Sequence, residues 1–315
     1  MRSNSTKIMV GIGLLLCFSF SQSKTEQGGG ISIYVLGTAQ DGGYPQAGCT
    51  NDCCKHFYNA EEPKRSPACL ALVDKTTGKY WIFECTPDFP GQLKKLHDIA
   101  GIPLKEIPDG IFITHAHVGH YAGLINLGRE IMGTKDVPVY LLPRFEKFIR
   151  TNGPWSQLVS LNNIKIHHLT ADSTINLTEK IKITPVKVPH RDEFSETAGF
   201  RIEANGKIIL FIPDIDKWEK WDRSIIKEVK ASDQALLDGT FFKDGELSGR
   251  SMKEVPHPFI KETMNLFDSL PPKEKIKIKF IHFNHTNPMN WDRNVRQGIK
   301  QMGYDYAVEG EKIDL

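Results

Sequence analysis

The sequence has few cysteines, no strong excess of either charge and no long hydrophobic run beyond its N-terminal segment. Six cysteines occur in 315 residues, and 40 basic residues stand against 38 acidic ones. A hydrophobic fraction of 40% and a charged fraction of 25% are those of an ordinary globular protein. This composition excludes a fibrous chain, a disordered chain and a protein with many membrane spans. The balanced charge also provides no basic face for nucleic acid.

Residues 1–23 have the pattern of a secretory signal peptide. Arg2 and Lys7 precede an apolar run, Ile8–Phe20, and small serines follow it. The run is short for a membrane span, so cleavage is predicted, with an uncleaved anchor as the alternative. Cleavage would leave 38 basic and 38 acidic residues. We therefore expect a periplasmic or secreted protein without a stable membrane span; its oligomeric state does not follow from the sequence.

Three of the remaining cysteines lie close together and are followed by a histidine: Cys49, Cys53, Cys54 and His56. Adjacent cysteines rarely pair, because the resulting ring is strained. Three close thiols therefore favour a metal-binding knuckle. The alternative is a disulfide such as Cys69–Cys85 with spare thiols, although both residues lie in apolar stretches where cysteines are commonly buried.

Strands are expected to outnumber helices in both halves of the chain. The apolar patterns predict strands over 31–37, 69–73, 80–84, 111–114, 137–142, 164–169, 181–188, 199–203, 207–212, 235–238, 277–282 and 306–309. They predict helices over 90–100, 119–132, 258–269 and 293–302, and a long loop over 38–67. No linker or low-complexity tract separates the halves. Two sheets with helices outside is the natural packing, with a site on the loops at the strand ends.

Three histidines follow the short apolar strand at 111–114: His115, His117 and His120. Their spacing brings imidazoles together at a strand terminus, which is an arrangement typical of metal ligands. The segment resembles the His-x-His-x-Asp-His signature of the metallo-β-lactamase superfamily. Gly119 stands where that family has Asp, a residue that usually ligates the second metal and directs the attacking water. The second metal position therefore lacks its usual carboxylate or takes one from another residue.

The resemblance implies a four-layer αβ/βα sandwich over residues 24–315, with two β-sheets, helices on the outer faces and a zinc-knuckle insertion around 38–67. It implies a first metal position built from His115, His117 and His190. It implies a second position built from His120, Asp214 and His282, with Asp214 bridging the two. His282 is preferred to His285 because it ends a strand.

The resemblance also implies a structural zinc at the knuckle, held by Cys49, Cys53, Cys54 and His285, with His56 as the alternative fourth ligand. The expected cofactor is zinc, one or two ions in the active site and one structural ion. Iron would suit the same histidine and carboxylate ligands.

Four residues are candidates for catalytic roles. Asp214 is a candidate base, with Asp41 as another. Asp88 follows an early strand and is expected to bond a ligand histidine, or else to cap the next helix. His257 is expected to donate a proton to the leaving group, or else to lie at the surface.

Further segments resemble the branch of pyrroloquinoline quinone biosynthesis protein B: residues 37–46, 86–89, 237–241 and 285–288. The main hypothesis is an exported metal-dependent hydrolase of a phosphodiester, lactone or other acyl bond in a small molecule. The first alternative is a metal-dependent oxidase or hydroxylase of a small phenolic substrate. The second is a non-catalytic metal-containing binder of a small molecule, which the loss of Asp at position 119 favours.

Overall fold

The structure, a computed structural model, describes Met1, residues 30–247, residue 249 and residues 251–315. The predicted signal peptide, apart from Met1, lies outside the described residues. None of the helices in the described part of the chain is long and apolar enough to cross a membrane.

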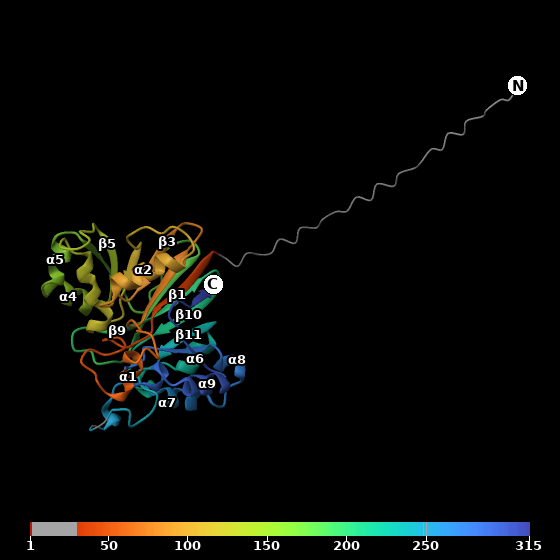
Figure 1. The fold of residues 1–315 in the computed structure, drawn as a ribbon. Coiled ribbons are helices and arrows are strands. Elements are labelled where there is room, and N and C mark those ends of the chain that lie inside the picture. Colours follow the sequence, from red (N-terminus) through yellow and green to blue (C-terminus); the bar gives the residue numbers. More distant parts are fainter. Residues whose placement is uncertain (2–29, 248, 250) are drawn as a thin grey trace.

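Two mixed β-sheets form the centre of the fold (Figure 1). The first has the order β14-β1-β2-β3-β4-β5-β6. Its strands are β1 (Ile31–Gly37), β2 (Cys69–Asp74), β3 (Lys79–Phe83), β4 (Gly110–Phe112), β5 (Val137–Leu141), β6 (Ile164–His168) and β14 (Lys312–Asp314). The second has the order β13-β12-β11-β10-β9-β8-β7. Its strands are β7 (Ile175–Asn176), β8 (Ile181–Val188), β9 (Thr197–Ala204), β10 (Lys207–Ile212), β11 (Gln234–Asp238), β12 (Ile278–Ile281) and β13 (Asp305–Tyr306).

Helices cover the outer face of each sheet (Figure 1). The α-helices are α1 (Asp52–Tyr58), α2 (Phe89–Ile99), α3 (Val118–Tyr121), α4 (Pro143–Thr151), α5 (Trp155–Ser160), α6 (Ile225–Lys230), α7 (Ile260–Phe267), α8 (Pro272–Lys275) and α9 (Arg293–Gln301). The 3-10 helices are η1 (Ala122–Leu127), η2 (Trp218–Lys220), η3 (Met252–Glu254) and η4 (Pro288–Asn290). Buried side chains of α2, α4 and α5 pack on the first sheet, and those of α6, α7 and α9 pack on the second. The four layers confirm the predicted sandwich.

The inner faces of the two sheets pack against each other through aromatic rings. The ring centroid of Phe83 lies 5.1 Å from that of Phe112 within the first sheet and 5.5 Å from that of Phe200 in the second. All three side chains are fully buried. Such pairs contribute about 0.5–1.5 kcal/mol each beyond the burial of their area. This core fixes the two sheets relative to each other and therefore fixes the loops at their ends.

Several predicted elements differ from those in the structure. The helix predicted over 119–132 is only the short α3 followed by η1, because the glycines of this segment have low helix propensity. The sequence patterns missed α4 and α5, which connect the parallel strands β5 and β6. A parallel pair requires such a crossover, so the topology explains helices that the local pattern did not indicate. Helix α1 also lies inside the predicted loop over 38–67.

Candidate metal centre

The candidate centre lies where strands of both sheets end. His115 and His117 follow β4, His190 follows β8, Asp214 follows β10 and His282 follows β12. Strands β10, β11 and β12 are parallel to one another, and β4 is parallel to β3. Side chains just beyond the carboxyl ends of such strands meet at one edge of the sheet. The fold therefore gathers residues that are far apart in the chain.

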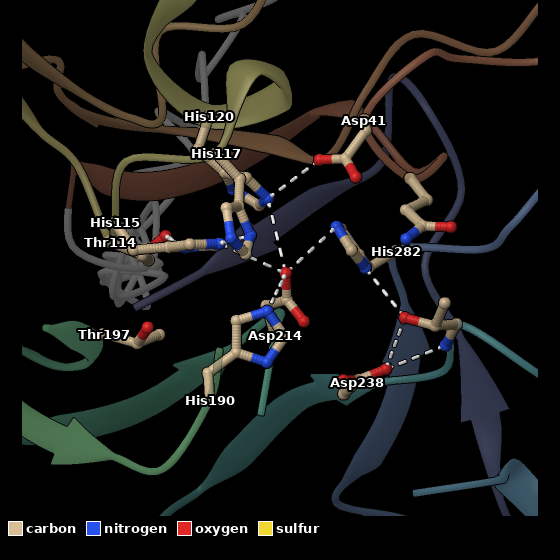
Figure 2. A network of polar contacts seen from close by, with 12 residues as sticks. Asp41, Thr114, His115, His117, His120, His190, Thr197, Asp214, Asp238 and His282 are labelled. Carbon is tan, nitrogen blue, oxygen red and sulfur yellow. Dashed lines mark hydrogen bonds and ion pairs between the residues drawn. The ribbon is translucent and has the colours of Figure 1, made fainter. Parts of the chain in front are cut away.

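Asp214 lies in the middle of this group of histidines (Figure 2). Its Oδ2 atom lies 3.4 Å from His115 Nε2, 3.6 Å from His120 Nε2, 3.4 Å from His190 Nε2 and 3.9 Å from His282 Nε2. Burial raises the pKa of Asp214, but the neighbouring histidines outweigh burial and hold that pKa well below its usual range. The carboxylate is therefore ionised at neutral pH.

The ligand atoms form two groups, each of which could hold a metal ion. One comprises His115, His117, His190 and Asp214, and the other comprises Asp41, His120 and His282. Within each group all ligand atoms lie within 4.8 Å of one another. The Nε2 atoms of His120, His190 and His282 are buried and have no hydrogen-bond partner. Buried polar atoms are rarely left unpaired, so these orphaned nitrogens fit metal ligation.

Burial keeps most of these imidazoles neutral. It lowers the pKa of His190 to about 4 and lowers those of His115 and His282 as well. A neutral imidazole offers a lone pair to a cation without first losing a proton. His120 differs: burial lowers its pKa, but the carboxylates of Glu84 and Asp41 outweigh burial and raise it. In the absence of metal, His120 is thus held by carboxylates on both sides.

The outer nitrogens of three candidate ligands contact a fixed partner. His115 Nδ1 lies 2.8 Å from Thr114 Oγ1, and His282 Nδ1 lies 2.9 Å from Thr240 Oγ1. His120 Nδ1 lies 3.2 Å from Glu84 Oε1. Such partners set the ring orientation and the tautomer of a ligand histidine. The inner Nε2 atoms therefore point at the centre before any ion binds.

Two of these residues have strained backbone. Glu84 has φ +78° and His282 has φ +70°, and both side chains are fully buried. Non-glycine residues rarely adopt this left-handed region, and strain of this kind concentrates at functional sites. Sequence reasoning missed Glu84. The available signal was an acidic residue ending the otherwise apolar strand predicted over 80–84.

Asp88 does not lie in the centre. Its Oδ2 atom pairs with Lys64 Nζ at 2.8 Å, and it makes no side-chain bond at the N-terminus of α2. The predicted contact with a ligand histidine is made by Glu84 instead. Asp88 enters a turn that starts a helix, which directs its side chain to the surface, whereas Glu84 directly follows β3 and its amide donates to the carbonyl of Phe112 at 2.8 Å.

Replacing Asp88 with Asn should therefore leave the metal content unchanged and change the free energy of unfolding by no more than about 0.5 kcal/mol, as is usual at surface positions. Metal analysis by mass spectrometry and urea unfolding would measure both quantities. A loss of metal in this variant would show that Asp88 does contribute to metal binding at the centre.

His257 is buried beside the first group rather than at the surface. Its Nδ1 atom lies 2.9 Å from Asp238 Oδ2 and 3.1 Å from Asp214 Oδ1. Burial lowers the pKa of His257, but Asp238 and Asp214 outweigh burial and raise it to about 10. The protonated ring therefore offsets part of the negative charge of Asp214 when metal is absent.

A separate cluster lies at the predicted knuckle. Cys49, Cys53 and His285 bring their ligand atoms within 4.8 Å of one another. The two sulfurs lie 3.6 Å apart, far beyond a disulfide bond and close to the spacing of about 3.8 Å for two thiolates on one tetrahedral zinc. Cys54 is buried against both thiols but is not one of the three converging ligands.

The structure does not support two alternatives from the sequence, namely His56 as the knuckle histidine and a disulfide between cysteines. The His56 ring stacks on Trp291 with centroids 5.9 Å apart, and its Nδ1 atom lies 2.6 Å from Glu61 Oε2. Cys69 and Cys85 are both free in the structure, so the alternative of a Cys69–Cys85 disulfide is not realised.

Comparison with known proteins supports this description of the fold. The model of the family described as "Beta-lactamase superfamily domain" matches residues 80–283. Coenzyme PQQ synthesis protein B of Klebsiella pneumoniae (strain 342) is 26% identical over 311 residues, covering 90% of this chain and 98% of the relative. The crystal structure of Zn(2+)-bound PqqB from Methylobacterium extorquens has a TM-score of 0.75 at 20% identity, covering 90% of this chain and 100% of that chain. A diphosphatase from the PhnP family has a TM-score of 0.64 at 20% identity, covering 90% and 97%.

Proposed function

Since this chain belongs to the beta-lactamase superfamily, whose model matches residues 80–283, we propose that it is a metal-dependent oxidase or hydroxylase of a small phenolic molecule. The observation that carries this proposal is the match along the whole of the relatives. The Klebsiella pneumoniae protein named for coenzyme PQQ synthesis is covered over 98% of its length, so the similarity extends over almost the whole of that relative.

The main sequence-based hypothesis, an exported hydrolase, is wrong. One hydrolytic neighbour, the PhnP-family diphosphatase, is only 20% identical and shares the fold alone. Fold does not determine reaction, because chemistry is set by the site. The relatives at 26% identity are named instead for synthesis of a coenzyme. Export remains a separate proposal that depends only on the signal-like pattern of residues 1–23.

His115, His117, His190 and Asp214 would hold the principal metal ion, with zinc and iron both suited to these ligands. When bound, a redox-active ion such as iron would supply the chemistry that brings dioxygen to react with an aromatic ring. In a hydroxylation, one oxygen atom enters the ring and the other leaves as water, with two electrons and two protons from an external reductant. Asp214 carries the charge that attracts the cation, and Asp238 holds His257 against it.

The surroundings of His117 suit an aromatic substrate. His117 Nε2 lies 3.0 Å from Glu193 Oε2, and the next residue, Phe194, is 57% exposed. The Phe194 ring centroid lies 5.4 Å from that of Phe148, which belongs to an aromatic cluster with Trp155. Aromatic rings prefer to pack against other rings. The exposed ring of Phe194, which follows the residue that contacts His117, is therefore a suitable docking surface for a small phenol.

The proposal predicts iron-dependent oxygen consumption. Purified protein loaded with iron, given ascorbate and a phenolic substrate such as tyrosine, should consume oxygen and yield a product heavier by one oxygen atom. An oxygen electrode and mass spectrometry would measure the two. The zinc-loaded protein and His117→Ala should be inactive, whereas His168→Ala, an exposed histidine bonded to Glu146, should be as active as wild type. Oxygen uptake no greater with iron than with zinc would refute the proposal.

A further inference from the structure

Gly119 stands where the family signature has an aspartate. In the structure, another residue occupies the space that such a side chain would need. A Cβ atom built on Gly119 would lie 2.3 Å from Asp41 Oδ1 and 2.4 Å from Asp41 Cα. Real Cβ atoms essentially never approach heavy atoms so closely. The space that any side chain at position 119 would need is therefore occupied by Asp41, which lies in the loop after β1.

Asp41 points into the second group of ligands (Figure 2). Its Oδ1 atom lies 3.5 Å from His120 Nε2 and belongs to the group that includes His282. This oxygen and both Nε2 atoms are buried and have no hydrogen-bond partner.

The backbone beside Asp41 is fixed to the strand end that carries His282. The amide of Gln40 donates to the carbonyl of Phe283 at 2.9 Å, and the Asn284 side-chain amide donates to Gln40 Oε1 at 2.5 Å. Ala39 and Phe283 also form a parallel β-bridge. Hydrogen bonds between the neighbouring residues therefore fix the position of Asp41 relative to His282.

We propose that Asp41 supplies the carboxylate of a second metal position together with His120 and His282, in place of the absent side chain at position 119. The two arrangements exclude each other sterically, because a side chain at 119 would displace Asp41. The inference does not depend on which reaction the centre performs. Its tests measure metal binding and not turnover, so the failure of one proposal is distinguishable from the failure of the other.

The test compares the metal content of full-length wild type with Asp41→Ala and Asp41→Asn after loading with zinc and dialysis. Each variant should lose about one ion per chain or bind that ion at least about tenfold more weakly, because ligation needs the carboxylate. Asp98→Ala, which removes an exposed carboxylate paired with Lys94, is the matched control and should keep all its metal. Wild-type zinc content and affinity in both Asp41 variants would overturn the proposal.

A double-mutant comparison separates a ligand from a residue that merely supports the loop. His120→Ala should lose the same ion, and the double variant Asp41→Ala/His120→Ala should lose no more than either single variant, since ligands of one ion are not additive. Additive losses of separate ions would contradict the shared site. Circular dichroism of the metal-free proteins would check that each variant is folded before the comparison is made.

Discussion

Replacing Asp214 with Asn should empty both groups of ligands and abolish oxygen consumption. Asp214 Oδ2 lies within 3.9 Å of the Nε2 atoms of four histidines, and these histidines belong to both groups, so loss of its charge should weaken both. The amide is close to it in shape but lacks the charge that offsets the cation. Loss of an outer-shell partner already costs about 10–100-fold in metal affinity, so loss of this ligand should cost at least about 100-fold.

The matched control is Asp216→Asn. Asp216 lies two residues further along the chain, and its Oδ2 atom pairs with Lys220 Nζ at 2.8 Å. Equilibrium dialysis with zinc and oxygen uptake with iron would be measured on both variants. The expected result is a loss of metal and turnover only at position 214. A metal-replete Asp214→Asn protein would show that the remaining ligands hold the ions without the Asp214 carboxylate.

Replacing Cys53 with Ser should remove about one zinc per chain and lower the free energy of unfolding by several kcal/mol. The Cys49 and Cys53 sulfurs and a His285 nitrogen converge, and these residues join the short helix α1 to the loop after β12. Structural zinc contributes about 10–16 kcal/mol in isolated zinc fingers, and a segment already packed on Trp291 should depend on it less.

Two comparisons define this second result. His56→Gln should keep the zinc, because His56 stacks on Trp291 and does not join the converging ligands. The group around His117 should keep its own ion in Cys53→Ser. Metal analysis and guanidinium unfolding, performed with and without a chelator, would measure these effects. If Cys53→Ser unfolds like wild type and binds as much zinc, the three converging ligands are not a zinc site.

The parts of the centre that the sequence predicts are those attached to the ends of regular strands. Asp214 and His282 come just after the ends of apolar strands, so their positions in the chain place each at an edge of the sheet. The same reasoning separates His282, whose Nε2 atom lies 3.9 Å from Asp214 Oδ2, from His285, which converges with Cys49 and Cys53. Chain order and strand direction are enough to place Asp214 and His282, and the packing of the structure adds little to that placement.

The residues that sequence reasoning misjudged are those whose direction depends on a turn. Asp88 follows a strand as expected, but the turn into α2 brings it to Lys64. Glu84 reaches His120 only because its own backbone adopts a positive φ. The role of Asp41 depends on a loop without periodicity, fixed by hydrogen bonds to residues more than 240 positions away. No local pattern encodes such contacts.

The unusual backbone of Glu84 and His282 bears on how this protein can change over evolutionary time. Glycine adopts positive φ without strain, whereas for other residues this conformation costs about 1–3 kcal/mol of conformational free energy. Glycine at either position would relieve the backbone and remove a side chain from the centre. A search for thermostable variants would therefore tend to select glycine at 84 and 282, and the most stable descendants of this chain would be those that had lost its chemistry.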